Sequence, residues 1–221
     1  FLDTDTLEKA RGITIFSKQA LLTAGNTEIS LLDTPGHVDF STETERTLQV
    51  LDYAVLVVSG TDGVQSHTET LWRLLRRYHV PTFVFVNKMD LPGKGREELL
   101  TQLQHRLGEG FVDFGAAQAD RDEALALCDE TLMNRMLDEG TLTDAEITQA
   151  IARRHVFPCW FGSALRRTDN DQLESVDALL EGIDRFTRPA PVLESFGAKV
   201  FKISQDEQGT RLTWLRVTGG E

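Results

Sequence analysis

Polar residues stand at the ends of three apolar segments of the chain. Asp33 ends the first segment, Asn87 ends the second, and Ser163 lies two residues beyond the third. In an open α/β sheet, ligands bind beyond the carboxyl ends of the strands, so these positions are expected at one edge of a sheet. The turn at Pro35 and Gly36 leaves a backbone N–H free for a phosphate, while the Asp33 carboxylate can serve a phosphate-bound metal ion.

The motif N-K-M-D at residues 87–90 carries groups that can select guanine. The Asp90 carboxylate can accept hydrogen bonds from two adjacent donors of guanine, the ring N1–H and the exocyclic amine. Adenine has an acceptor at the ring position, so it would leave a buried carboxylate unmatched, at a cost on the order of several kcal/mol. Asn87 can brace neighbouring loops and contact N7 of the base, and the stem of Lys88 can cover the base plane. The backbone N–H of Ala164 can donate to the guanine carbonyl oxygen.

Each motif also has an ordinary structural interpretation. Taken alone, the motif D-T-P-G at 33–36 fits a strand–turn–helix connection as well as it fits a metal site. Thr14 alone is one more β-branched residue in an extended segment. We interpret the scattered histidines as solvated or packing side chains, and the arginines within 73–77, 153–154 and 166–167 as solvated surface residues. The functional hypothesis therefore depends on the motifs occurring together and in order.

The spacing of apolar residues predicts the elements that would position these side chains. The segment up to residue 22 and the strand at 27–33 are predicted to form an antiparallel hairpin. Buried strands, covered on both faces in a parallel sheet, are predicted from the apolar runs at 53–58, 82–86 and 155–161, the last being the final strand. Helices are predicted at 38–51, around 71–78 and around 173–183. This alternation indicates a doubly wound α/β sheet.

Two further regions are predicted outside this repeating pattern. The first is a helical insertion at about 94–154, with helical stretches near 95–107, 121–138 and 143–154. The second follows a linker at 188–191 and contains alternating strands at 198–203 and 211–217. We therefore expect a domain at 1–188 and the start of a β domain at 192–221.

Composition limits the classes of function. A net charge of −12 argues against general affinity for nucleic acid or for an anionic membrane, because a phosphate backbone would be repelled. No signal peptide and no apolar run of transmembrane length are present, so we expect a cytoplasmic protein. The chain starts without Met and stops at a turn signal, which suggests a piece of a longer protein.

Four motifs in this order resemble those of translational GTPases. They are R-G-I-T-I at 11–15, D-T-P-G-H at 33–37, N-K-M-D at 87–90 and G-S-A-L at 162–165. Within that group the chain is most similar to the elongation factor G-like ribosomal-protection proteins that confer tetracycline resistance. The similarity covers nearly the whole chain, including 197–217, which resembles the start of the family's second, β-barrel domain. The resemblance implies a sheet of the P-loop GTPase type, a domain that binds GTP and GDP with Mg²⁺, and the ribosome as partner.

The resemblance also implies roles for individual residues. Thr14 would ligate Mg²⁺ in the GTP state, and Asp33 would hold the same ion through water. Gly36 would offer its N–H to the γ-phosphate, and His37 would orient the attacking water once the ribosome positions it. Hydrolysis would then release both switch segments. Guanine would be held by Asn87, Lys88, Asp90, Ser163, Ala164 and Leu165.

The sequence departs from the family pattern in two places. The phosphate-binding motif G-x-x-x-x-G-K-S/T does not occur in it and would be expected before residue 1, so we expect the chain as given to bind GTP poorly and to hydrolyse very little. The region between Asp90 and Ser163 is shorter than the insertion of elongation factor G and longer than that of elongation factor Tu, which favours the ribosomal-protection type. An elongation factor G-like translocase and a nucleotide-independent ribosome-docking module are the alternatives.

Overall fold

The computed structural model describes residues 18–34, 41–167, 173–205 and 208–220. The chain forms two compact units. One consists of Tyr53–Arg188, and the other combines Phe1–Asp52 with Pro189–Glu221. The chain re-enters the second unit at Pro189, within the segment interpreted as a linker. Among the described helices, none combines the length and the apolar character that a membrane-spanning segment requires.

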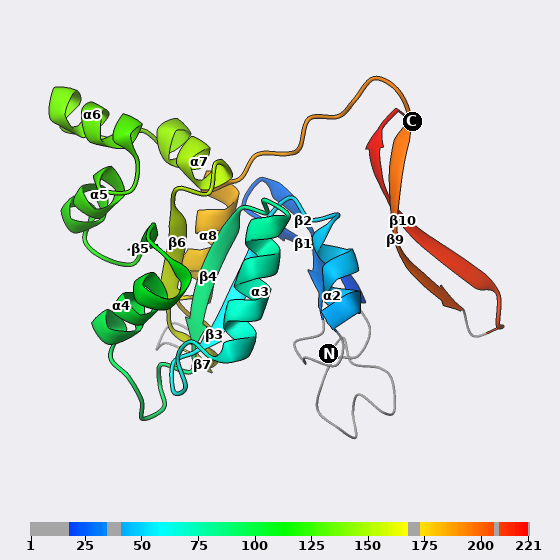
Figure 1. Ribbon diagram of the computed structural model, residues 1–221, viewed down its shortest axis with the longest axis horizontal. Helices are drawn as coiled ribbons and strands as arrows, with labels where there is room; N and C mark the ends of the chain where they lie inside the picture. Colours follow the sequence, from blue (N-terminus) through cyan, green and yellow to red (C-terminus); the bar gives the residue numbers. More distant parts are fainter. Residues whose placement is uncertain (1–17, 35–40, 168–172, 206–207, 221) are drawn as a thin grey trace. The chain divides into compact units, whose positions relative to one another are not determined.

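A parallel sheet of four strands forms the centre of the unit Tyr53–Arg188 (Figure 1). In spatial order its strands are β3 (Ala54–Ser59), β4 (Thr82–Asn87), β6 (Phe157–Phe161) and β5 (Phe111–Asp113). Strands β3 and β4 pair in register from Ala54 opposite Thr82 to Ser59 opposite Asn87. The apolar run of β4 is buried throughout, as expected for a strand covered on both faces. The structure thus confirms the α/β class and the parallel sheet.

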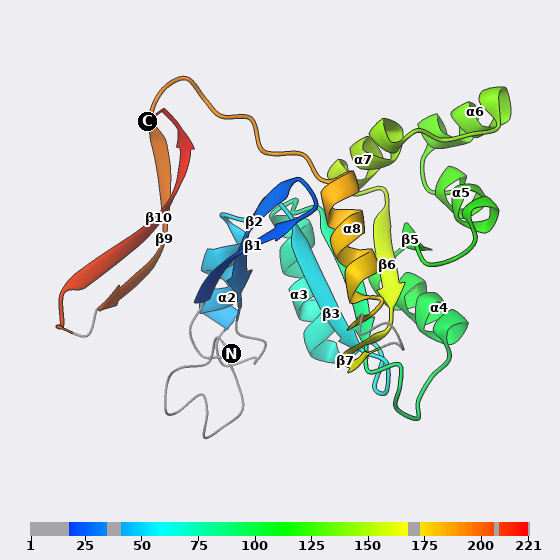
Figure 2. The same cartoon turned by 180° about the vertical axis from the view of Figure 1, so that it is seen from behind.

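Helices cover the two faces of this sheet. Helices α3 (Ser66–Arg77) and α4 (Arg96–Leu107) lie on one face, and α8 (Val176–Phe186) lies on the other (Figure 1, Figure 2). On the α3 side, Trp72 packs edge-on against Phe157 with ring centroids 4.6 Å apart. On the α8 side, Trp160 packs so closely over Gly182 that a side chain there would overlap the indole ring. Residues of one strand therefore anchor helices on opposite faces.

The region 94–154 differs from the predicted helical insertion. It contains α4, α5 (Gln118–Ala126), α6 (Glu130–Glu139) and α7 (Asp144–Ala152), but also the three-residue strand β5, which pairs with β6. The prediction that 155–161 is the last strand is therefore correct in chain order, but in space β6 lies between β4 and β5. The helix predicted at 121–138 is divided into α5 and α6. A short antiparallel pair, β7 (Ser163–Arg167) and β8 (Leu173–Glu174), was not predicted.

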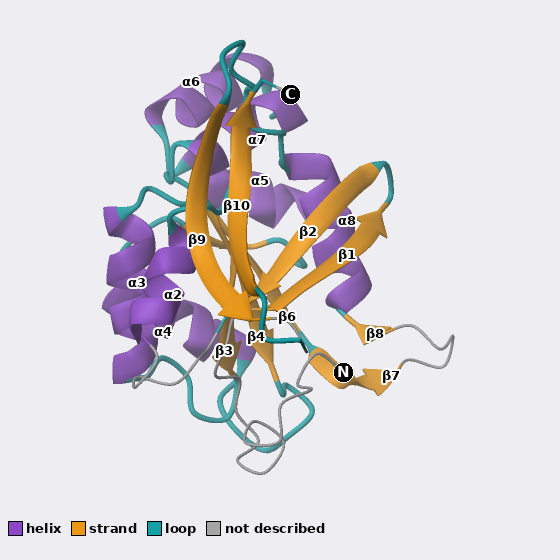
Figure 3. Cartoon of the chain, turned by 90° about the vertical axis from the view of Figure 1, so that its right-hand side faces the viewer, coloured by secondary structure: helices purple, strands orange, loops and turns teal. Residues whose placement is uncertain are grey.

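The other unit contains two antiparallel pairs and one described helix. Strands β1 (Lys18–Ala24) and β2 (Thr27–Asp33) form the predicted hairpin, with Lys18 opposite Asp33. Helix α2 (Ser41–Leu48) falls within the helix predicted at 38–51. Strands β9 (Gly197–Gln205) and β10 (Arg211–Gly219) form a long two-stranded ribbon (Figure 3). Within this unit, Arg216 of the ribbon hydrogen-bonds the carbonyl of Val50 at 2.6 Å and the carboxylate of Asp52 at 2.6 Å.

Candidate nucleotide-binding site

Strand pairing brings two of the predicted motifs together. Val86 of β4 pairs with Phe161 of β6, so the chain segments that follow these strands leave the same edge of the sheet side by side. The N–H of Gly162 donates to the carbonyl of Val86 at 3.0 Å, and the N–H of Met89 donates to the carbonyl of Gly162 at 3.1 Å. The motif at 87–90 and the motif at 162–165 are therefore neighbours in space.

Asn87 joins three segments at this edge. Its side-chain oxygen accepts hydrogen bonds from the N–H groups of Lys88, at 2.8 Å, and Ala164, at 2.9 Å. Its backbone carbonyl accepts from the N–H of Gly60, at 2.7 Å, in the loop after β3. The Ala164 N–H, which the sequence interpretation assigned to the guanine carbonyl, thus donates to Asn87 in this structure. No described residue accepts a hydrogen bond from the Asn87 side-chain N–H₂ group.

Residues 88–93, here called the base loop, turn back directly after Asn87. Lys88 has φ 65°, in the left-handed region that residues other than glycine rarely adopt, and this conformation costs on the order of 1 kcal/mol. The N–H of Leu91 donates to the carbonyl of Lys88 at 3.2 Å and closes the turn. Asp90 is exposed, and none of the described residues hydrogen-bonds its carboxylate. Both carboxylate oxygens are thus available to a ligand with two adjacent donors.

The residues after β6 differ in what holds them. Ser163 is only 2% exposed, and its hydroxyl accepts a 3.3 Å hydrogen bond from the N–H of Arg166. Leu165 is 95% exposed, so its side chain packs against nothing in the described structure. Ser163 therefore shapes the turn that presents Ala164, whereas a role for Leu165 would rest on its backbone.

The loop at residues 60–65, here called the β3–α3 loop, adjoins the base loop and was interpreted from the sequence only as a strand break. A Cβ on Gly93 would lie 2.9 Å from Cα of Thr61 and 3.0 Å from the carbonyl oxygen of Gly60, so the two loops touch backbone to backbone. The hydroxyls of Ser59 and Thr61 donate to Asp62 at 2.7 and 3.0 Å and lower the pKa of that carboxyl group. The sequence shows a glycine in each loop, Gly60 and Gly93, but only the fold shows that these two glycines lie against each other.

The other four predicted site residues belong to the unit that combines 1–52 with 189–221. Asp33 ends β2 and belongs to the unit that does not contain the base loop. Thr14, Gly36 and His37 lie outside the described residues. Among the described residues, the Asp90 carboxylate has no partner and lies in the loop held by Asn87, an arrangement that fits the two adjacent donors of a guanine base. Of the two residues predicted to hold Mg²⁺, Thr14 and Asp33, the structure describes Asp33, which supplies a carboxylate.

Comparisons with known proteins agree with this fold. The sequence model of the family described as "Elongation factor Tu GTP binding domain" matches residues 1–189. A crystal structure of a protein from Thermus thermophilus superposes with a TM-score of 0.80 at 23% identity, covering 99% of this chain and 39% of that one. At this identity the likeness establishes the fold alone.

Two curated relatives carry resistance in their names. The oxytetracycline resistance protein of Streptomyces rimosus is 37% identical over 245 residues, covering 99% of this chain and 36% of the relative. The tetracycline resistance protein TetM of Streptomyces lividans is 36% identical over 238 residues, covering 97% and 37%. The chain thus spans a little more than a third of the length of these relatives. Since the family model covers most of it, the chain belongs to the family of elongation factor Tu GTP-binding domains.

Proposed function

We propose that this chain is the guanine-nucleotide-binding part of a ribosome-dependent translational GTPase of the tetracycline-resistance, ribosomal-protection type. One observation carries the proposal: at the carboxyl edge of a parallel sheet, Asn87 is held by hydrogen bonds, and the nearby Asp90 carboxylate has no partner among the described residues. The family supports GTP as the nucleotide, and the names of the two Streptomyces relatives support the resistance function. This function would place the protein in the cytoplasm.

In this proposal the described residues recognise the base. Asp90 accepts from N1–H and from the exocyclic amine of guanine. The side-chain N–H₂ of Asn87 donates to N7, while its oxygen keeps the base loop and the turn at Ala164 together. The stem of Lys88 covers the base plane. Because Ala164 N–H is already bonded to Asn87, donation to the guanine carbonyl requires that N–H to be shared or to move.

The remaining machinery is proposed from the resemblance alone. Thr14 and Asp33 would hold Mg²⁺, which when bound neutralises phosphate charge. Gly36 would donate its N–H to the γ-phosphate, and His37 would orient the attacking water on the ribosome. An elongation factor G-like translocase would use the same residues. The length of the segment between Asp90 and Ser163 favours ribosomal protection.

A nucleotide-independent docking module is the candidate from another class. In such a module the sheet and its helices would persist only as a surface that docks on the ribosome.

The deciding experiment titrates fluorescent GDP and GTP, with Mg²⁺, into this chain after its intact mass is confirmed. A parallel titration uses the natural polypeptide that contains the chain. Guanine-selective binding by either supports the proposed function, and ATP serves as the competitor that must fail. If neither binds, the docking module is the better account. Restoration of tetracycline-inhibited translation by the natural polypeptide supports ribosomal protection, whereas driving tRNA movement supports translocation.

A further inference from the structure

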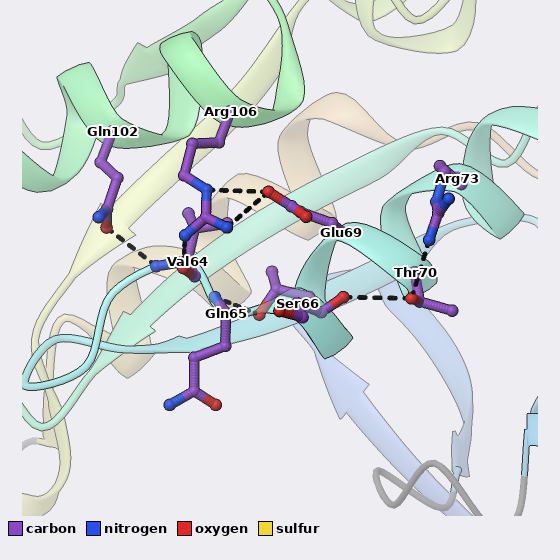
Figure 4. Close-up of polar contacts among 9 residues, drawn as sticks. Val64, Gln65, Ser66, Glu69, Thr70, Arg73, Gln102 and Arg106 are labelled. Atoms are coloured by element: carbon purple, nitrogen blue, oxygen red, sulfur yellow. Dashed lines mark hydrogen bonds and ion pairs between the residues drawn. The ribbon is translucent and has the colours of Figure 1, made fainter.

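The β3–α3 loop is held by two side chains that lie outside the predicted site. The side-chain oxygen of Gln102 accepts a 2.9 Å hydrogen bond from the N–H of Val64, and the guanidinium of Arg106 donates to the carbonyl of the same residue (Figure 4). Both side chains come from α4. We call the pair Gln102 and Arg106 the Val64 clamp.

The buried position of Val64 gives these contacts their importance. Val64 is only 3% exposed, so its N–H and carbonyl lose water when the loop is in place and need partners within the protein. The preceding residue, Gly63, has φ +70°, and a Cβ there would overlap the Gln102 side-chain oxygen. The loop conformation and the position of Gln102 therefore fit one another.

The same loop touches the base loop on its other side. The N–H of Gly60 donates to the Asn87 carbonyl at 2.7 Å, and the N–H of Gly63 donates to the Ser59 carbonyl at 2.7 Å. The base loop packs through Gly93 onto Thr61. The β3–α3 loop therefore lies between the Val64 clamp and the residues proposed to hold guanine.

These contacts form a closed ring. The base loop ends at residue 93 and α4 starts at Arg96, so the helix that carries the clamp directly follows the loop that carries Asp90. From α4 the ring passes through the clamp to Val64 and along the β3–α3 loop. It returns to the base loop at Gly60, Thr61 and Gly93. A ring of this kind limits the conformations of every segment in it.

We propose that Gln102 and Arg106 are positioning residues for the base loop. By fixing Val64 they hold the β3–α3 loop against residues 88–93 and so keep Asp90 in place for its ligand. The part of this proposal that concerns nucleotide rests on the proposed function. The part that concerns the loops does not, because it follows from contacts within the chain itself.

An ordinary helix–helix contact is the competing explanation for Arg106. Its guanidinium also pairs with Glu69 of α3 at 2.7 and 2.8 Å, and the two side chains are 38% and 36% exposed. Ion pairs of this exposure contribute little to stability. Glu69→Gln removes the charge of this pair and leaves the Arg106 contact to Val64, so it separates the two explanations.

The test measures amide hydrogen exchange in this chain without nucleotide. The variants are Gln102→Leu and Arg106→Met, which remove the clamp, and Glu69→Gln. The matched control is Arg73→Met, which removes the exposed 3.1 Å contact of Arg73 with Thr70 on the same helix α3 (Figure 4). The reporters in the base loop are the N–H groups of Met89 and Leu91, which donate to Gly162 and Lys88. The amides of β4 report on the stability of the unit as a whole.

We expect both clamp variants to raise exchange at Met89 and Leu91 roughly tenfold, because each loses a bond to a buried backbone group. Glu69→Gln and Arg73→Met should change it less than about twofold. Faster exchange at Val64 alone would overturn the proposal, and so would an equal rise in the β4 amides or an effect of Glu69→Gln as large as that of Arg106→Met.

A second readout concerns nucleotide. In the natural polypeptide, the clamp variants should release fluorescent GDP roughly five- to tenfold faster, whereas Arg73→Met should not. Unchanged release from a protein that binds GDP would overturn the positioning role. Failure of the wild type to bind GDP would count against the proposed function, while the exchange result would still decide the loop coupling.

Discussion

At the scale of residues, Asn87 and Asp90 serve different ends although they belong to one motif. Asn87 uses its side-chain oxygen to bind two backbone N–H groups of the protein, whereas Asp90 has no partner among the described residues. The guanine-selecting role proposed for Asp90 comes from the chemistry of the motif and stays a prediction. The bond from Asn87 to Ala164 joins residues 77 positions apart, so its partner emerges only once β4 and β6 are paired.

Replacement of Asn87 tests this division of roles. Asn87→Ala leaves the N–H groups of Lys88 and Ala164 without their acceptor, so we expect the free energy of unfolding to fall by about 1–3 kcal/mol in urea denaturation. Asp90→Asn is the matched control three residues away and should change it by less than about 0.5 kcal/mol. Equal losses in the two variants would contradict the distinction.

His37 lies outside the described residues, so its role is a prediction from the resemblance. In the natural polypeptide, His37→Ala should retain GTP binding and lose most ribosome-stimulated hydrolysis, by roughly 100-fold or more, because only the attacking water loses its partner. Fluorescent GTP titration and single-turnover hydrolysis with ribosomes measure the two properties. A parallel loss of binding would make His37 a structural residue.

At the scale of elements, the break between α5 and α6 shows what apolar spacing misses. The helical pattern continues through 121–138, but Asp129 caps the N-terminus of α6 by accepting from the N–H groups of Thr131, at 2.8 Å, and Leu132, at 3.2 Å. The same carboxylate pairs with His155 at the start of the segment that leads into β6. A capping residue interrupts a helix without altering its hydrophobic period, so the period predicts one helix where two are present.

The cap makes a pH-dependent contribution to stability. Burial raises the pKa of Asp129, but hydrogen bonds from His155, Leu132 and Thr131 outweigh it and hold the pKa below its usual 3.8. A lowered folded-state pKa stabilises the fold above pH 3.8, and this contribution disappears as the pH falls through the lower value.

We therefore expect Asp129→Ala to lower the free energy of unfolding by about 1–2 kcal/mol at pH 7, with a smaller difference from the wild type at about pH 3. Urea denaturation at the two pH values provides the measurement. Asp138→Ala on the exposed face of α6 is the control and should have little effect. A difference that grew on acidification would have the wrong sign for this account.

Arg154 corrects the interpretation of the basic pair at 153–154 as solvated. Its guanidinium lies 4.8 Å from the ring centre of Trp72 and 5.0 Å from that of Phe157. It donates to the hydroxyl of Thr82 at 3.0 Å and to the carbonyl of Val80. Burial, with the nearby charge of Arg76, lowers the pKa of Arg154 to about 10. Arg154 is partly buried, whereas its neighbour Arg153 is exposed, and two adjacent arginines in a sequence do not reveal this difference.

Arg154→Met should therefore lower the free energy of unfolding by about 2 kcal/mol, because it uncouples the turn after α7 from the start of β4 and removes the stacking on two rings. Arg153→Met, at the exposed neighbouring position, should cost less than about 0.5 kcal/mol. Urea denaturation compares the two. Arg154→Lys should fail to rescue, since an ammonium group lacks the planar fork.

At the scale of the whole molecule, the parallel sheet could be predicted because its central strand is covered on both faces and leaves a continuous apolar run. The prediction was less accurate for β3, which is an edge strand among the described residues and has Val55 and Val57 39% and 59% exposed. Strands β5 and β8 have three and two residues, too few to produce a pattern, and β5 is held in the sheet by pairing with β6, far along the chain. Sequence pattern thus predicts long local elements and misses pairings decided by tertiary contact.

The same limit applies to the candidate site. Its motif residues were predicted from side-chain chemistry, whereas the Val64 clamp was not, because Gln102 and Arg106 act on a loop 38 and 42 residues earlier. Polar residues on a helix carry no local sign of such a contact. A motif can therefore suggest residues whose chemistry suits a ligand, but it gives no sign of the residues that hold the loop carrying them.

The proposed function depends on the selection of guanine by Asp90. The most direct test measures the affinities of GDP and XDP for the natural polypeptide and for its Asp90→Asn variant. The wild type should prefer GDP. Asp90→Asn should weaken the affinity for GDP by roughly 100-fold and raise the affinity for XDP, because the side-chain amide can donate a hydrogen bond to the C2 carbonyl of xanthine. An unchanged preference for GDP in the variant, or an equal loss of both ligands, would contradict the account.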